Sequence, residues 1–172
     1  MTIHVAGPTL VRSSSGTGDW TVWAVEQRAG VARVERRPDL IEVVVADAPA
    51  GDGSEAGFTA VACTAEGEAM VLRQAAPPAL LVGASSCRTA PADPGGRELV
   101  AMGPDELLLL LSASALEARP AVLSQNLQSP AHLLDLDPAR LLAELFTDVP
   151  YGAGAMLRRC APTPTELEEP TR

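Results

Sequence analysis

Three aspartates lie at strand ends or in turns, where carboxylates could bind a metal ion. Asp47 closely follows the apolar run 40–45 (LIEVVV), Asp52 lies in the glycine-rich turn beyond it, and Asp19 precedes an alternating strand pattern. Carboxylate oxygens are the ligands that hard divalent cations prefer. One reading of Asp19, Asp47 and Asp52 is therefore a loose, water-rich site for a single ion. The other reading is structural, with the Asp47 carboxylate accepting backbone N–H groups in the tight turn that follows.

The other residues that could carry chemistry indicate no further site. Three cysteines, Cys63, Cys87 and Cys160, show no CxxC spacing and no nearby histidine cluster, which argues against a zinc site or a disulfide framework. Ser112 and Ser114 lie outside any GxSxG elbow, and with two histidines in the chain a nucleophile–base pair is not expected. The Gly-Asp-Gly turn lacks the framework of a phosphate-binding loop. We therefore expect no nucleophilic enzyme and no nucleotide site.

Composition excludes further classes of partner. The chain has 172 residues and a net charge of −9, and all 13 basic residues are arginines. Nucleic acids and anionic membranes are bound through concentrated positive charge, so neither is an expected partner. No apolar stretch approaches the ~20 residues of a membrane span, and the first residues lack the pattern of a secretory leader. These features predict a cytoplasmic protein.

The elements that must position these residues are mostly short strands. Alternating or continuous apolar runs predict strands at 21–25, 31–35, 40–45, 58–64, 69–74, 79–82, 99–102, 106–111 and 155–159. Ser114 is expected to cap a helical turn that ends at Arg119, and Asp137-Pro138 to begin a helix through Phe146. Residues 83–96 read as a loop. The order predicts an α+β layered domain over 1–160, followed by a disordered Pro/Glu-rich tail at 161–172.

Five segments in chain order carry patterns that occur together in one enzyme family. They are GTGDWTVWAV (16–25), VVVADAPAGDG (43–53), FTAVACTAEGEAMVLRQAAPPALLV (58–82), MGPDELLLLLSASALEARP (102–120) and PYGAGAMLRR (150–159). Together they resemble the metal-dependent serine/threonine protein phosphatases of type 2C, the PPM superfamily, especially its stage II sporulation E-like branch. The resemblance implies a layered antiparallel β-sandwich with flanking helices, and it places Asp47 where the family has its bridging metal aspartate.

The departures from the family pattern affect its chemistry. The resemblance implies two Mn²⁺ or Mg²⁺ ions, held by carboxylates, that generate a hydroxide for attack on a phosphoryl group. In this chain the aspartate of the family's Thr-Asp-Gly motif is lost within 112–114, and its Asp-Asp pair is Gly152-Ala153. Serine and glycine cannot supply the missing negative charge. We therefore expect no metal cofactor; the alternative is Mn²⁺ or Mg²⁺ at a vestigial site.

A deletion also separates the chain from the family. The family has a pair of helices after the metal turn, whereas only residues 54–57 precede the next strand here. One helical layer should be reduced or missing, although the strands are apolar on both faces at Val43, Val44, Val45, Val61, Cys63, Val71 and Leu72. Two alternatives would cover the exposed face: a second chain in a symmetric homodimer, or this chain's own loops or its segment 119–136.

Three hypotheses on function follow. The first is a catalytically inactive phosphatase-like domain that binds a protein partner, such as a phosphorylatable signalling protein. The second is a weak metal-dependent serine/threonine phosphatase that uses Asp19, Asp47 and Asp52. The third is a structural assembly module whose dimer face is its function.

Overall fold

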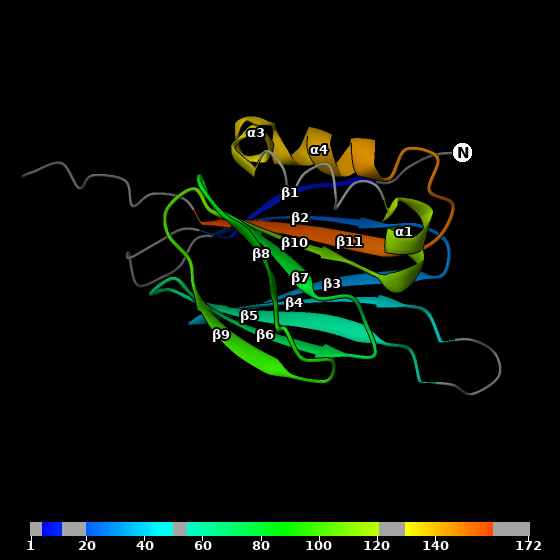
Figure 1. The fold of residues 1–172 in the computed structure, drawn as a ribbon, viewed down its shortest axis with the longest axis horizontal. Helices are drawn as coiled ribbons and strands as arrows, with labels where there is room; N and C mark the ends of the chain where they lie inside the picture. The colour runs from blue at the N-terminus through cyan, green and yellow to red at the C-terminus, as the bar shows by residue number, and fades with distance from the viewer. Residues whose placement is uncertain (1–4, 12–19, 50–54, 121–129, 160–172) are drawn as a thin grey trace, which may run out of the picture.

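Two antiparallel sheets pack face to face in the computed structural model, which describes residues 5–11, 20–49, 55–120 and 130–159 (Figure 1). The covered sheet has the order β1 (Val5–Val11), β2 (Trp20–Glu26), β11 (Ala153–Arg159), β10 (Leu107–Leu111), β7 (Ala79–Val82), β8 (Cys87–Ala90). The open sheet has the order β3 (Gly30–Arg37), β4 (Leu40–Asp47), β5 (Phe58–Thr64), β6 (Glu68–Gln74), β9 (Arg97–Ala101). The predicted layered β-sandwich with flanking helices is confirmed.

Alternation along the strands explains the core between the sheets. In β4, β5 and β6 every second residue is buried, because successive side chains of a strand point to opposite faces. The inward positions are held by small aliphatic side chains such as Val43, Val61 and Val71, each with no exposed surface. A chain with few aromatic residues therefore builds this core from valine, leucine and alanine.

Helices α3 (Pro130–Asp135) and α4 (Pro138–Leu145) lie on the outer side of the covered sheet, while α1 (Ala113–Ala118) lies at one end of the sandwich, against β11 and β4 (Figure 1). As predicted, Asp137 and Pro138 begin α4, whose leucines 141, 142 and 145 are buried. They form a second core with Trp23 and Met156 from the sheet. Among the described residues, no helix has the length and apolar character needed to cross a membrane.

The open sheet carries no helix on its outer face in the described part of the chain (Figure 1). The predicted loss of one helical layer is therefore confirmed. The segment 119–136 was one expected cover, but its residues in α3 pack on the covered sheet instead, where Leu133 lies in the core with Leu80 and Val82. For this part of the segment, that expectation is wrong.

Some local predictions were wrong. The strand β8 lies within 83–96, which was expected to be a loop, and it pairs with β7 along the edge of the covered sheet. Only Ala90 of β8 is buried, so this edge strand has no apolar alternation to reveal it. The residue that caps α1 is Ser112, not Ser114. The predicted tail at 161–172 lies outside the described residues.

Candidate functional site

Strand ends from both sheets meet at one end of the sandwich, beside α1. β4 ends at Asp47, which pairs with Gly30 at the start of β3. From the covered sheet come Ser112, directly after β10, and Gly152, directly before β11. We call these residues, together with Ser114 of α1, the Asp47 end. It holds the positions that the resemblance assigns to metal chemistry.

Asp47 has a structural partner at this end. Its Oδ2 accepts a hydrogen bond from the backbone N–H of Ser114 at 3.1 Å. This bond joins the open sheet to the first turn of α1. The sequence indicated that the carboxylate accepts a backbone N–H, but the donor lies 67 residues further along the chain. The other oxygen, Oδ1, is buried and has no hydrogen-bond partner among the described residues.

Gly152 stands where the resemblance expects an acidic residue, and its surroundings exclude a side chain. Its φ is 100°, and an added Cβ would lie 2.6 Å from Ser112 Oγ and 2.8 Å from Ala115 N. Its N–H donates to the Arg28 carbonyl at 3.1 Å, and its carbonyl accepts from Gln27 N–H at 2.8 Å. Positive φ and short Cβ contacts both favour glycine. A carboxylate at this position would require the backbone to move.

Ser112 is used in the same structural way. Its side chain is 1% exposed, and Oγ accepts a hydrogen bond from Ala153 N–H at 3.0 Å. Oγ also accepts from Ala115 N–H at 3.5 Å, a long bond that caps α1. Buried polar groups are stable when they are hydrogen-bonded. The hydroxyl therefore links β11 to α1, two elements that carry metal ligands in the resembled family.

The two sheets touch through their backbones beside Asp47. A Cβ added to Gly30 would overlap the carbonyl oxygen of Gly152, so the first residue of β3 lies directly against the residue before β11. Next to this contact, Ala48 N–H donates to the Ala29 carbonyl at 2.6 Å. Only glycine permits such an approach of two backbones. The Asp47 end is thus closed by main-chain packing.

These residues do not fit a two-metal centre. Within the described ranges, no group of three or more histidine, cysteine, aspartate or glutamate side chains could hold a metal ion. Of the three candidate ligands the structure places Asp47, while Asp19 and Asp52 lie outside the described residues. Divalent ions such as Mg²⁺ are bound through several oxygens. Asp47 offers one free oxygen, and its neighbours Ser112 and Gly152 bring no charge.

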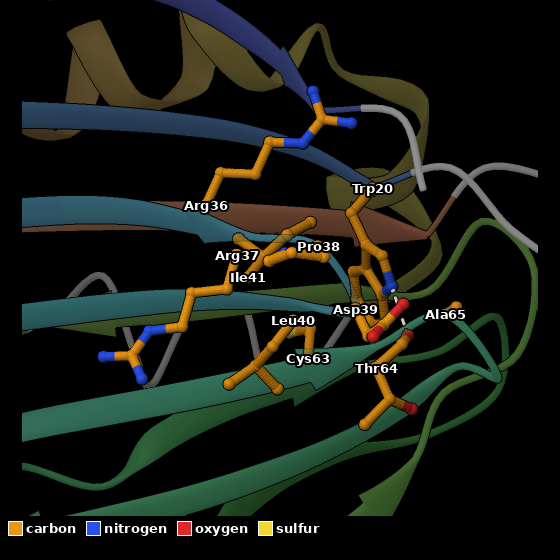
Figure 2. Close-up of a pocket in the computed structure, with 10 residues that line it drawn as sticks. All are labelled: Trp20, Arg36, Arg37, Pro38, Asp39, Leu40, Ile41, Cys63, Thr64 and Ala65. Atoms are coloured by element: carbon orange, nitrogen blue, oxygen red, sulfur yellow. Dashed lines mark hydrogen bonds between the residues drawn. The ribbon is translucent and has the colours of Figure 1, made fainter. Parts of the chain in front are cut away.

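The opposite end of the sandwich holds a small pocket (Figure 2). Trp20, which starts β2, donates its indole N–H to the Thr64 carbonyl at 2.8 Å, at the end of β4 remote from Asp47. The pocket has a volume of about 10 Å³, close to one water molecule. Cys63 also lines it, and burial raises the pKa of this thiol. A protonated thiol is a poor nucleophile and metal ligand, so the pocket is part of the core.

An open groove of about 390 Å³ lies beside α1, and sequence reasoning missed it. Its lining is mostly apolar: Arg73, Ala75, Ala76, Pro77, Pro94, Ala113, Leu116 and Glu117. One wall is fixed by the buried Arg73, which donates to the carbonyls of Ala92 at 2.7 Å and Asp93 at 3.1 Å. The only signal in the sequence was the clustering of prolines at 77–78 and 91–94.

Comparisons with known proteins bear on the fold. No family model and no curated protein matches this sequence. Among solved structures, the phosphatase domain of the cell fate determinant SpoIIE from Bacillus subtilis aligns with a TM-score of 0.64 at 10% identity, over 91% of this chain and 99% of that one. RsbX in complex with magnesium aligns with a TM-score of 0.57 at 8% identity, over 92% and 99%.

A longer neighbour contains a second domain. The structure of the RsbU and RsbW domains of a Mycobacterium tuberculosis protein aligns with a TM-score of 0.66 at 15% identity. The match covers 86% of this chain and 63% of that one. All three alignments extend over most of this chain, so they compare whole architectures. The resemblance noted in the sequence is confirmed at the level of fold: this chain has the architecture of the PPM, or type 2C, phosphatase domains in their SpoIIE-like form.

Proposed function

We propose that this chain is a phosphatase-like domain that does not hydrolyse phosphate esters and that acts by binding a protein partner. The observation that supports this most strongly is the closure of the Asp47 end. Where the fold would gather carboxylates, Gly152 leaves no room for a side chain and Ser112 binds backbone N–H groups. Asp47, the one candidate ligand among the described residues, holds the start of α1.

The chemistry of the resembled family explains why this arrangement should be inactive. Metal-dependent hydrolysis requires ions that lower the pKa of a bound water to near neutrality. Ions of this kind are held by several hard oxygen ligands. Here two of the expected ligand positions lack an acidic side chain, at 112–114 and 152–153. Turnover should therefore not exceed the uncatalysed rate.

The class of partner is proposed from the structural neighbours. The RsbU domain of the M. tuberculosis protein is joined in one chain to an RsbW domain, and SpoIIE is described as a cell fate determinant. We propose a comparable setting for this chain: a phosphorylatable signalling protein as partner, in the cytoplasm. The open groove beside α1, lined by Leu116 and Pro77, offers apolar surface next to the former catalytic end.

Hydrolysis of an aryl phosphate tests this proposal. The full chain, Asp47→Asn and the matched control Asp39→Asn are assayed with and without Mn²⁺. We expect all three to match the buffer rate under both conditions. Mn²⁺-dependent turnover that is lost in Asp47→Asn and kept in Asp39→Asn would contradict the proposal, and would support the weak metal-dependent phosphatase instead.

An assembly module is a second candidate, favoured by a separate observation. The outer face of the open sheet carries exposed apolar side chains, with Leu99 the most exposed at 54%. Large exposed apolar patches mark interaction surfaces. If assembly is the function, the oligomeric state should depend on this face and should not change with variants at the Asp47 end. Sedimentation of Asp47→Asn beside the unmodified chain tests this.

A further inference from the structure

The outer face of the open sheet gathers most of the exposed large apolar side chains of the described residues. Four such side chains are at least one third exposed: Met70 at 39%, Leu72 at 39%, Leu99 at 54% and Tyr151 at 47%. The first three lie together, because Met70 pairs with Leu99 and Leu72 follows on the same side of β6. One contiguous apolar patch results, and it spans β6 and β9.

The strand register arranges this face in rows across the sheet. Two middle rows run from β3 to β9, through side chains that are direct neighbours on adjacent strands. The first row is Arg33, Val44, Ala60, Leu72, Arg97, and the second is Glu35, Glu42, Ala62, Met70, Leu99. Alanines therefore occupy the centre, with larger apolar side chains on β6 and β9. Charged side chains lie on β3, at Glu42 of β4 and at Arg97 of β9.

The charges along β3 are only partly paired within the chain. Arg37 forms ion pairs with Glu42 at 3.2 Å and with Glu35 at 3.9 Å. Arg33 forms no ion pair within the described residues. It borders a hollow of about 350 Å³ over β3 and β4, lined also by Val31 and Val44 among others. The rest of the lining is charged, at Glu35, Arg37 and Glu42. The Arg33 guanidinium can gain a further acidic partner when another surface closes over it.

We propose that a second copy of this chain covers the face, related by a twofold axis that crosses the strands at mid-sheet. The middle of strands β3 to β6 falls between the two rows, so this axis places the first row of one copy over the second row of the other. Isologous contacts form twice, once on each side of the axis. This places Arg33 over Glu35, Ala60 over Ala62 and Leu72 over Met70. It also places Val44 over Glu42 and Arg97 over Leu99.

Two stacked sheets can also be related by a twofold axis parallel to the strands. The positions of the charges favour the axis that crosses the strands. An axis parallel to the strands would place β3 over β9, with each row lying over itself. Arg33 would then face Arg97 of the other copy, and Glu35 would face Leu99, so these two rows would place no opposite charges over each other. Juxtaposed like charges disfavour an interface, whereas opposite charges favour it. The face is thus complementary to a second copy of itself in one orientation.

The extent of the face is adequate for a dimer. Five strands about 4.8 Å apart, with about seven residues each at about 3.3 Å per residue, span roughly 550 Å² of sheet plane. A stable interface buries about 800 Å² of accessible surface per partner, and protruding side chains expose more area than the plane beneath them. Two such faces packed about 10 Å apart would form a third layer of core.

Sedimentation velocity of the full chain from about 1 to about 100 µM tests the proposal, since a dimer must dissociate on dilution. We expect Arg33→Glu and Glu35→Arg each to weaken dimerisation about tenfold, and the double variant R33E/E35R to restore it. Arg140→Glu on α4 serves as the control and should leave the dimer unchanged. Tighter dimerisation by Arg33→Glu would indicate the axis parallel to the strands and would overturn the proposed symmetry.

A second set of variants tests the face itself. Ala62→Arg places a long cation at the centre and should abolish the dimer at all these concentrations, whereas Tyr151→Arg, away from the face, should not. Circular dichroism and thermal unfolding establish that each variant folds. A chain that stays monomeric at about 100 µM, or a dimer that tolerates Ala62→Arg, overturns the proposal. Neither outcome bears on hydrolysis at the Asp47 end, which is measured separately.

Discussion

The Asp47 end and the outer face of the open sheet differ in how completely their groups are paired. At the Asp47 end, Ser112 Oγ and both main-chain groups of Gly152 have hydrogen-bond partners, and the sheets touch through backbone. On the open face, Leu72 and Leu99 are exposed and no described helix covers them. Apart from the buried Asp47 Oδ1, which has no described partner, the first region is held together by internal hydrogen bonds, while the second leaves apolar side chains exposed.

The exposed face follows from a short connection directly after Asp47. The family pattern continues from its metal aspartate into a pair of covering helices, whereas here β5 starts at Phe58, shortly after Asp47. The short connection leaves one sheet face without a described helix, whereas the closed end depends on Ser112 and Gly152 elsewhere in the chain. Substitutions at the closed end should cost folding stability, and those on the open face should change association instead.

The largest effect is expected from Gly152→Asp, which restores an acidic residue to the family position. Its Cβ would lie 2.6 Å from Ser112 Oγ at a φ of 100°. We expect a loss of about 3 kcal/mol or more in the free energy of unfolding, from combined overlap and backbone strain. Denaturant unfolding measures it. The control is Gly95→Asp, where φ is also positive but nothing lies within 4 Å of the added Cβ. Equal losses in both variants would contradict the closed junction.

A smaller loss is expected from Ser112→Ala. The substitution leaves the N–H groups of Ala153 and Ala115 without their acceptor in a buried setting. An unsatisfied buried group costs about 1–3 kcal/mol. The exposed Ser85→Ala is the matched control and should change the unfolding free energy little. An unchanged unfolding midpoint in Ser112→Ala would show that the hydroxyl does not hold this end together.

A further prediction concerns the dependence of stability on pH. On β5, Cys63 faces the core, whereas its neighbour Ala62 faces outward. Burial raises the pKa of the Cys63 thiol above its unfolded value. The folded state therefore keeps a proton that the unfolded state loses, and stability falls as the pH rises above about 8.5. The slope reaches up to about 1.4 kcal/mol per pH unit.

The absence of lysine leaves few other groups that titrate between about pH 8.5 and 10. Unfolding free energies measured across this range should therefore report mainly the thiols. Cys63→Ala should flatten the profile and lower the stability at neutral pH only modestly. An equally steep alkaline loss in Cys63→Ala would mean that another group is responsible.

The smallest effect on unfolding is expected from Leu99→Lys on the open face. Its side chain is already 54% exposed, so in dilute solution the free energy of unfolding should change by less than about 0.5 kcal/mol. The same substitution at the neighbouring buried Val100 should unfold the chain. A large loss at Leu99 in dilute monomer would show that part of the chain itself covers this face.

Sequence patterns predicted those elements whose burial is regular. Strands β4 to β6 alternate, and α4 combines a first-turn proline with a leucine stripe, so both were predicted. β8 was missed because an edge strand with one buried residue shows no periodicity. The alternation of apolar residues in a sequence arises from the burial of one face, and an exposed edge strand has no such buried face.

The candidate site was only partly accessible to such reasoning. The missing acidic residues at 112–114 and 152–153 were visible in the sequence, and they indicated the loss of a metal centre. The closure of the Asp47 end could not be predicted from the sequence. It depends on the contact of Gly30 with Gly152 and on the hydrogen bond between Asp47 and Ser114. These residues are far apart in the chain, and only the sheet register brings them together.

Calorimetric titration of the full chain with Mn²⁺ tests most directly whether the Asp47 end is a structural junction and not a metal centre. Asp47→Asn and the exposed Asp39→Asn are titrated in parallel. We expect no saturable binding with a Kd below about 1 mM in any of the three proteins, because one carboxylate oxygen is too few ligands for a divalent ion. Saturable binding by the unmodified chain that disappears in Asp47→Asn and persists in Asp39→Asn would contradict this account.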